Sequence, residues 1–531
     1  GVTENRGTLI LVVATNSAPD LSNELSRLQT DLVGDGWSVI RQDVSSNDTP
    51  DSVREDIMGY YQADTTNVEA VFLFGHVPIL ESGYLNYDGH YTRAMPADAF
   101  YGEMNNDWPT DVVPTKRPSY LPSDVALMVG RVDMYNMPGI GAAVPWPSEE
   151  ELLRNYLDKD HNWRNHLIPV NRQALMGDRR GTVDGALAMA ASGYRIFEPC
   201  VGPGNTIEAN IQDDAPVDQC WSYMLNTSSY LWAFGDGGGE VNSISYLGTN
   251  APYQTVLSTD IVGDNAQGVF VLLFGSFFGN WDRQDNIMRA VLATPTTGLA
   301  CAMSGEPHWF LHHMGLGETI GYGTRLTMNN STLYRNMSNI FTRAVYIGLM
   351  GDPTLRMEPL APPGSVSAAS GSGGVVLNWG SSADSVLGYH VYRAMSPEGP
   401  FSRLTGTWVA GNTYVDNSAT PNTYTYMVRA VTLQTNPSGS YYNLSQGAFA
   451  TVTYTPLPAF INVTINMTAG AAALTWNSVS GAAYHVVSAT NMMQSAWLNV
   501  SGPLAAAGAN TTWIDSGSDT NLPHFYRVVS P

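Results

Sequence analysis

Residues Thr8–Ala14 read TLILVVA, an apolar run rich in β-branched side chains. A run of this length and composition is typical of a strand buried on both faces of a parallel sheet. Leu21–Leu32 follows with helical spacing of its apolar residues, and Trp37–Asp43 has the pattern of a second strand. Val53–Tyr61 and Val68–Phe74 then repeat the alternation of helix and strand. This order favours a parallel sheet with helices between its strands.

The same alternation continues to about residue 360. Glu149–Trp163 is predicted to be an amphipathic helix. The apolar segment Val125–Val129 precedes Gly130–Arg131. Further strands are predicted at Gln173–Met176, Tyr230–Phe234, Val269–Phe274 and Gly298–Met303. We therefore expect residues 1–360 to form one α/β domain whose mainly parallel sheet is covered by helices on both faces.

The pattern changes at the Pro/Gly-rich segment Leu360–Gly364, which has the composition of a linker. The strand-like segments Val375–Trp379 and Gly388–Ala394 follow it, and Ala473–Trp476 and Ala483–Ser488 repeat their Trp and Tyr-His-Val features. These two units resemble fibronectin type III modules, which are all-β immunoglobulin-like sandwiches, and Tyr424 is a candidate tyrosine corner. The predicted modules span residues 361–456 and 457–531, and the second is the shorter.

The composition restricts the classes of partner. The net charge is −22, and lysine occurs only twice, at Lys116 and Lys159. This charge disfavours binding to nucleic acid and to anionic lipid. No apolar run is long enough to span a membrane. Together with the appended modules, the composition indicates a secreted or cell-surface protein.

Cys200 and Cys220 lie 20 residues apart in a polar stretch, where a disulfide would close a loop and contribute about 3 kcal/mol. The sequence leaves open whether it forms. Cys301 lies in an apolar run and is expected to be a buried small hydrophobe.

Several segments of the first domain resemble the gingipain-like cysteine peptidases, a family with a caspase-like fold. The likeness rests on Val71–Pro78 (VFLFGHVP), Ala97–Trp108 (ADAFYGEMNNDW), Gly130–Arg131 and Gly351–Leu355 (GDPTL), which occur in the family's order. The resemblance implies a histidine general base in a Gly-His-Gly turn and a cysteine nucleophile at the end of a later strand. A thiolate attacks the carbonyl while the imidazole takes and returns the proton.

Both of these chemical groups differ here. The turn reads FGDGGG, with Asp236 where the family has histidine, and the strand end reads FGSFFGNW, with Ser276 where it has cysteine. A hydroxyl needs a base of suitable pKa, and a carboxylate is a weak one. We therefore expect an inactive site and a non-proteolytic, structural or adhesive protein.

A rebuilt hydrolase is the alternative. Ser276 would be its nucleophile, and His308, His312 or His313 would be its base, oriented by Asp236 or Asp282. The criterion is a ring nitrogen within about 3.5 Å of Ser276 Oγ. His308 and His312 would share one face of a helix, so metal binding or a purely structural use also remain open for this cluster.

Acidic residues offer candidate calcium ligands, because oxygen donors suit that ion. The candidates are Asp88, Asp107, Asp264 and Asp282. The alternative is that these aspartates cap helices and turns. No other cofactor is indicated.

The expected partners are further copies of the chain, as in an extracellular filament or other assembly, or other extracellular proteins. A polysaccharide is a further alternative, because Trp108, Trp281, Trp309 and Tyr101 would be able to line a cleft if they are exposed.

Overall fold

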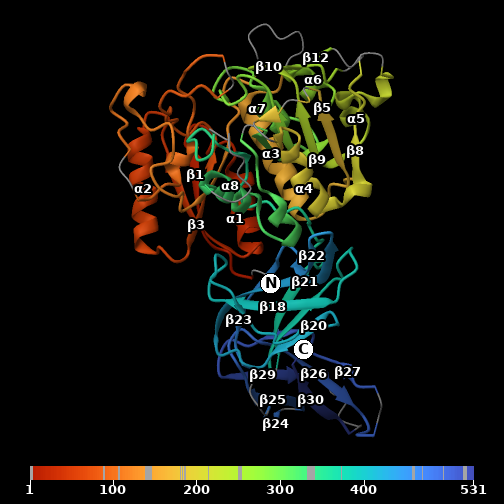
Figure 1. Ribbon diagram of the computed structural model, residues 1–531. Helices are drawn as coiled ribbons and strands as arrows, with labels where there is room; N and C mark the ends of the chain where they lie inside the picture. The colour runs from red at the N-terminus through yellow and green to blue at the C-terminus, as the bar shows by residue number, and fades with distance from the viewer. Residues whose placement is uncertain are drawn as a thin grey trace. The chain divides into compact units, whose positions relative to one another are not determined.

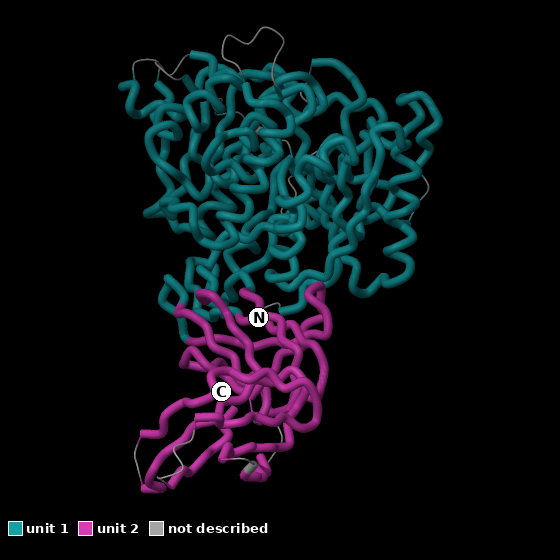
Figure 2. Tube along the Cα trace, turned by 180° about the vertical axis from the view of Figure 1, so that it is seen from behind, with its two compact units in different colours: residues 1–362, 382–387, 429–447 teal, residues 363–381, 388–428, 448–531 magenta. Residues whose placement is uncertain are grey.

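The computed structural model describes residues 4–530, apart from 88–89, 106–107, 138–145, 180, 182, 185–186, 213–214, 249–253, 306, 332–340, 372, 457–460, 469, 494–495 and 518–522. The chain divides into two compact units (Figure 2). Unit 1 contains residues 1–362, 382–387 and 429–447, and unit 2 contains residues 363–381, 388–428 and 448–531.

A ten-stranded sheet forms the centre of unit 1 (Figure 1). In spatial order its strands are β2 (Trp37–Val44), β1 (Gly7–Ala14), β3 (Val68–Phe74), β4 (Met128–Val132), β15 (Met350–Gly351), β14 (Ala300–Met303), β13 (Gly268–Phe274), β9 (Tyr230–Asp236), β5 (Ala174–Asp178) and β8 (Thr206–Glu208). Neighbouring strands run parallel, except that β14 and β15 are antiparallel. The central strands β9 and β13 are buried along their whole length, which explains their continuous apolar sequence.

Helices connect these strands. They are α1 (Ser22–Gly34), α2 (Pro50–Ala63), α3 (Glu149–Arg164), α4 (Ala191–Val201), α5 (Trp221–Thr227), α6 (Ser258–Gly263), α7 (Ile287–Leu292) and α8 (Ile320–Asn329). Capping boxes start α2 at Thr49 and α3 at Ser148, whose side chains accept backbone N–H groups of the first turn. The predicted α/β fold class is confirmed. Within the described part of the chain, no helix combines the length and the apolar character needed to cross a bilayer.

Two β-sandwiches follow. The first pairs the sheet β16 (Val366–Gly371), β17 (Gly374–Trp379) and β20 (Thr413–Asp416) with the sheet β19 (Ser402–Arg403), β18 (Gly388–Ala394), β21 (Asn422–Asn436), β22 (Gly439–Leu444) and β23 (Ala448–Tyr454). The hydroxyl of Tyr424 accepts the N–H of Thr420 at 3.2 Å, as in a tyrosine corner.

The second sandwich pairs β24 (Val463–Thr468), β25 (Ala471–Asn477) and β29 (Asn510–Asp515) with β27 (Leu498–Asn499), β26 (Ala483–Ala489), β28 (Leu504–Ala505) and β30 (Phe525–Val529). Its core is small and centres on Leu474, Trp476, Tyr484 and Val486. The predicted all-β modules are thus confirmed as folds.

Candidate functional site

The parallel strands β9 and β13 bring the two predicted site positions together. Phe274 of β13 lies opposite Asp236 of β9 in the register, so Asp236 ends one strand and Ser276 follows the end of its neighbour. The Asp236 side chain is fully buried, and Ser276 is 7% exposed. Both therefore lie at the carboxyl edge of the sheet, where open α/β sheets bind their ligands.

A histidine contacts Ser276, but it is His90. Its Nε2 lies 2.8 Å from Ser276 Oγ. The imidazole is stacked on the ring of Phe277, with centroids 5.1 Å apart and an angle of 18° between the planes. If the serine hydroxyl donates this hydrogen bond, His90 Nε2 is the acceptor, which is the arrangement of a nucleophile and its general base.

Arg93 links the segment that carries His90 to the loop that follows β13. Its Nε donates to Asn280 Oδ1 at 2.9 Å, and a terminal nitrogen donates to the Tyr87 hydroxyl at 2.7 Å. Its guanidinium also lies 4.7 Å from the centre of the Phe277 ring. The loop before β4 and the loop after β13 are thereby joined next to the His90–Ser276 contact.

Phe277 has an unusual backbone conformation. Its φ is +69°, a region that bulky side chains rarely adopt. Such outliers concentrate at functional sites, where surrounding contacts hold them. Here the conformation places the ring of Phe277 against His90, directly after Ser276.

Glycines of the FGDGGG turn lie close to Ser276. A Cβ built on Gly239 would clash with the backbone nitrogen and oxygen of Ser276, so only glycine permits this approach. Gly239 belongs to β10 (Gly238–Glu240), which pairs with β11 (Ser243–Ser245), and β11 pairs with β12 (Thr255–Leu257). The N–H of Gly237 donates to the carbonyl of Phe274 at 3.1 Å.

The predicted pairing of Ser276 with His308 is not found. His308 is buried, and neither of its ring nitrogens has a hydrogen-bond partner among the described residues. Burial and the nearby Arg195 lower its pKa to about 4. His312 and His313 lie in a short 3-10 helix and pack against each other, with ring centroids 4.2 Å apart. Pro307 and two glycines flank this segment in the sequence, and the two-turn helix that would align His308 with His312 does not form.

Calcium binding by the four candidate aspartates stays a prediction. Asp88 and Asp107 lie outside the described residues. Asp264 is the C-cap residue of α6. Its carboxylate accepts the side-chain N–H of Asn226 at 3.3 Å. Burial raises the pKa of Asp282. Across the ranges that the structure describes, no three His, Cys, Asp or Glu side chains gather in a way that would hold a metal ion.

The structure also places the candidate aromatic residues and the cysteines. Trp108, Trp281, Trp309 and Tyr101 are all buried, so they cannot form the exposed aromatic row that a polysaccharide site would need. Cys200, Cys220 and Cys301 are all buried free thiols, so no disulfide joins the first two.

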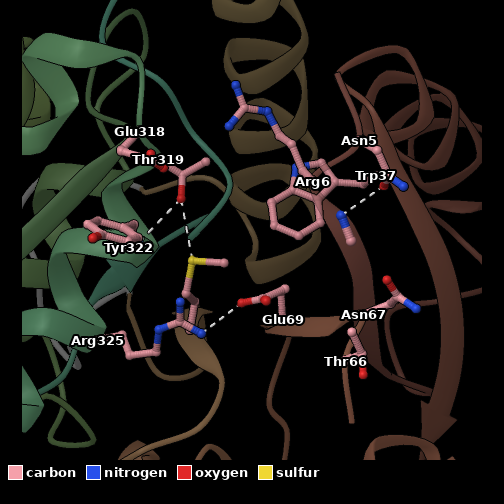
Figure 3. A pocket seen from close by; sticks show the side chains of 12 residues that line it. Asn5, Arg6, Trp37, Thr66, Asn67, Glu69, Glu318, Thr319, Tyr322 and Arg325 are labelled. Atoms are coloured by element: carbon pink, nitrogen blue, oxygen red, sulfur yellow. Dashed lines mark hydrogen bonds and ion pairs between the residues drawn. The ribbon is translucent and has the colours of Figure 1, made fainter. Parts of the chain in front are cut away.

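A polar pocket of about 320 Å³ lies in a different part of unit 1 (Figure 3). It is lined by residues next to the amino ends of β1 and β3, among them Arg6, Asn67 and Glu69, and by Thr319, Tyr322 and Arg325 around the start of α8. Arg325 is paired with Glu69 at 2.8 Å. Because the pocket lies at the amino edge of the sheet, it is separate from Ser276, which follows a carboxyl end.

No family profile and no curated protein matches the sequence. The crystal structure of the Arg-specific cysteine proteinase gingipain R aligns with 85% of this chain and 98% of its own, at 12% identity and a TM-score of 0.49. An Fn3-like protein from Clostridium thermocellum aligns with 19% of this chain and 99% of its own, at 27% identity and a TM-score of 0.16.

A two-domain fibronectin type III segment of chicken tenascin aligns with 32% of this chain and 99% of its own, at 13% identity and a TM-score of 0.16. The matches are thus to the two kinds of domain expected from the sequence. The architecture described above, a mainly parallel α/β sheet followed by two β-sandwiches, is the one that the resemblance to a gingipain-like domain with fibronectin type III-like modules predicted.

Proposed function

We propose that the chain is an extracellular serine-type hydrolase that cleaves an acyl bond, with Ser276 as the nucleophile and His90 as the general base. The observation that carries the proposal is the 2.8 Å contact between His90 Nε2 and Ser276 Oγ. The contact meets the criterion stated above, a ring nitrogen within about 3.5 Å of Ser276 Oγ. The histidine that meets it is His90 and not one of the expected residues His308, His312 and His313.

The proposed reaction follows the usual course of acyl transfer. Ser276 Oγ attacks the carbonyl carbon of the substrate while its proton passes to His90 Nε2. The imidazolium returns this proton to the leaving group, and an acyl-serine remains. Water then attacks the ester carbonyl while His90 takes one of its protons. The bond between the acyl carbon and Ser276 Oγ breaks, His90 returns the proton to that oxygen, and the acid is released. Peptides and esters are the substrate classes that such a step accommodates.

A covalent probe tests the nucleophile directly. The full chain should react with a fluorophosphonate, and mass spectrometry should place the label on Ser276. Ser276→Ala should abolish labelling, and His90→Ala should slow it by about 10²–10⁴-fold, the usual contribution of a general base. His485→Ala, in the second sandwich, is the matched histidine control and should label at the rate of the unchanged chain.

The variant Ser276→Cys gives a second, independent readout. A thiol beside His90 should have a lowered pKa, because an imidazolium stabilises the thiolate. Its alkylation by iodoacetamide should therefore continue to lower pH than that of a free thiol, and His90→Ala in the same background should remove this shift. The three natural cysteines are buried, which limits background reaction.

The second candidate function is a non-proteolytic, secreted structural or adhesive protein whose ancestral dyad has been replaced by Asp236 and Ser276. Two contacts favour this second candidate. Gly239 packs closely against the backbone of Ser276, and the Gly237 N–H is already bonded to the Phe274 carbonyl. Backbone N–H groups at such positions would be needed to bind an oxyanion. The His90–Ser276 contact would then only anchor a loop. A folded chain that leaves Ser276 unlabelled, with ordinary thiol reactivity in Ser276→Cys, would decide for this candidate.

A further inference from the structure

Aromatic rings form the surface beside the proposed nucleophile. The rings of Tyr91 and Phe277 lie with their centroids 6.0 Å apart and with an angle of 42° between their planes. His90 is stacked on the same Phe277 ring, and its Nε2 contacts Ser276 Oγ. Tyr91 and Phe277 each directly follow one member of the His90–Ser276 pair in the sequence. We call the rings of Tyr91 and Phe277 the aromatic surface.

Tyr91 is the exposed part of the aromatic surface. It is 55% exposed, whereas Phe277 is half-buried. Large apolar residues that are exposed singly are common and need no explanation. Tyr91 is not isolated in this way, because its ring continues the aromatic contact between Phe277 and His90. Ligand sites are lined mainly by aromatic and apolar side chains. A substrate bound at Ser276 would therefore have the Tyr91 ring close to the group beside its reacting carbonyl.

Arg93 supports the aromatic surface from within. Its guanidinium carbon lies 4.9 Å from the centre of the Tyr91 ring and 4.7 Å from the centre of the Phe277 ring. Arg93 is only 9% exposed, and its three guanidinium nitrogens donate to Asn280, the Tyr87 hydroxyl and the Tyr91 carbonyl. These bonds occupy donors that would otherwise attract an anionic substrate group.

The carboxylate of Asp236 is withdrawn from the surface as well. Asp236 ends β9 and is fully buried, so it offers no surface to a bound ligand. A cationic substrate group would therefore make no contact with Asp236, while the charge of Arg93 would repel it. The charges at the site thus favour a neutral substrate group over a charged one of either sign.

We propose that Tyr91 determines substrate specificity by binding a neutral aromatic side chain beside the acyl bond that is cleaved. The inference rests on the proposed function, because it takes Ser276 as the nucleophile. The substrate ring would pack on the exposed part of the Tyr91 ring, and aromatic pairs contribute more than the burial of their area alone. Substrates with a small or a charged side chain at this position would lack that contact.

Hydrolysis of the N-acetyl ethyl esters of phenylalanine, alanine and arginine by the full chain tests the proposal, because these substrates share one leaving group. In the unchanged chain kcat/KM should be highest for the phenylalanine ester. Tyr91→Ala should lower the ratio of kcat/KM for the phenylalanine ester to that for the alanine ester by about tenfold. This ratio cancels any effect of the substitution on the position of His90, because a displaced base slows both reactions.

Two variants control this measurement. Tyr91→Phe keeps the ring and should keep the ratio of the unchanged chain. Tyr442→Ala removes a tyrosine that is 46% exposed on β22, and it should also leave the ratio unchanged. A ratio that Tyr91→Ala does not lower would overturn the proposal. So would a higher kcat/KM for the arginine ester than for the phenylalanine ester.

A binding measurement separates this proposal from the proposed hydrolysis. In an NMR titration, the Ser276→Ala chain should bind N-acetylphenylalanine amide about tenfold more tightly than N-acetylalanine amide. Tyr91→Ala in the same background should remove this difference. If Ser276 resists the fluorophosphonate but the difference is found, the hydrolase function is wrong while the aromatic group is bound as inferred. If Ser276 is labelled but neither the ester ratio nor the binding depends on Tyr91, the hydrolase function stands and the inference is wrong.

Discussion

At the scale of single residues, Arg93 acts on the site through the groups that it holds. Its guanidinium bonds Asn280 and Tyr87 and covers the Phe277 ring, against which His90 is stacked. Arg93→Lys keeps the charge but loses the planar fork that reaches two partners. We expect fluorophosphonate labelling of Ser276 to slow by about tenfold, because a misplaced base is a less efficient one.

The pH profile distinguishes positioning from a general loss of structure. In Arg93→Lys the labelling rate should reach a lower plateau while its midpoint on the pH scale stays that of the unchanged chain, since His90 remains the base. A shifted midpoint would show that Arg93 does more than position this histidine. An unchanged rate would show that the fork is not needed.

His308 predicts an acid-sensitive contribution to stability. Burial and Arg195 lower its pKa from 6.5 to about 4. Between these values the unfolded chain binds a proton that the native chain does not bind, so the free energy of unfolding falls as the pH decreases from about 6.5 to 4. The loss reaches at most about 3 kcal/mol.

His308→Gln should remove this part of the pH dependence. Urea unfolding at pH 7 and at pH 4.5 measures it, as the difference between the two pH values in each protein. The carboxylates contribute equally to both proteins and cancel in the comparison. The same difference in variant and unchanged chain would contradict the assignment to His308.

His90 was beyond the reach of sequence reasoning. It precedes Ser276 by 186 residues and lies on an irregular segment, where no periodicity reports which way a side chain points. The neighbouring Asp88 is predicted only as a calcium ligand, and a loop residue carries no sign of a partner so distant in the chain. By contrast, Asp236 and Ser276 were identified through the resemblance to the gingipain-like peptidases, and the register of β9 and β13 places them at one edge of the sheet.

At the scale of elements, the buried strands were the most predictable part of the fold. Strands β1, β3, β9 and β13 have continuous apolar sequences because helices cover both faces of the sheet. The short strands β8 and β15 have no such pattern, and only their neighbours define them. The small antiparallel strands β10–β12 are held by backbone bonds of a glycine-rich segment, which hydrophobic patterning does not reveal.

A buried ion network ties α3 to the rest of unit 1. Arg164 near the end of this helix contacts Asp35 at 2.5 Å, Asp352 at 2.6 Å and Asp160 at 3.2 Å, and its side chain is almost fully buried. Burial alone would raise the pKa of Asp35, but the guanidinium groups of Arg356 and Arg164 lower it to about 2. These carboxylates therefore depend on Arg164 for compensation.

Arg164→Met should lower the free energy of unfolding by about 3–5 kcal/mol, because it leaves buried carboxylates without their partner. Arg27→Met is the matched control, since Arg27 pairs with Asp158 of the same helix at 2.5 Å but both side chains are partly exposed. It should cost no more than about 1 kcal/mol. Chemical denaturation measures both variants, and equal losses would contradict a role for burial.

At the scale of the whole molecule, the compact unit that contains the sheet does not coincide with a continuous stretch of chain. Unit 1 includes residues 382–387 and 429–447, which follow the predicted linker in sequence. Within this unit Arg356 donates to Asn443 Oδ1 at 2.7 Å and to the Leu444 carbonyl at 3.1 Å. Gln446 Nε2 donates to the backbone oxygen of Asp31 at 2.7 Å. Composition marked Leu360–Gly364 as a linker, but it could not reveal these bonds.

These contacts predict the outcome of truncation. A chain ending at Pro362 loses Asn443 and the Leu444 carbonyl as acceptors of the buried Arg356, which keeps only Asp35. Each hydrogen bond to a charged group contributes about 1.5–3 kcal/mol. We therefore expect a markedly lower Tm for residues 1–362 than for residues 1–456, which keep every segment of unit 1. Removing residues 457–531 alone should leave the unfolding of unit 1 unchanged, because none of them belongs to it. Calorimetry of the three chains measures this, and an equal Tm for residues 1–362 and 1–456 would mean that the bonds of residues 429–447 add nothing to the stability of the α/β domain.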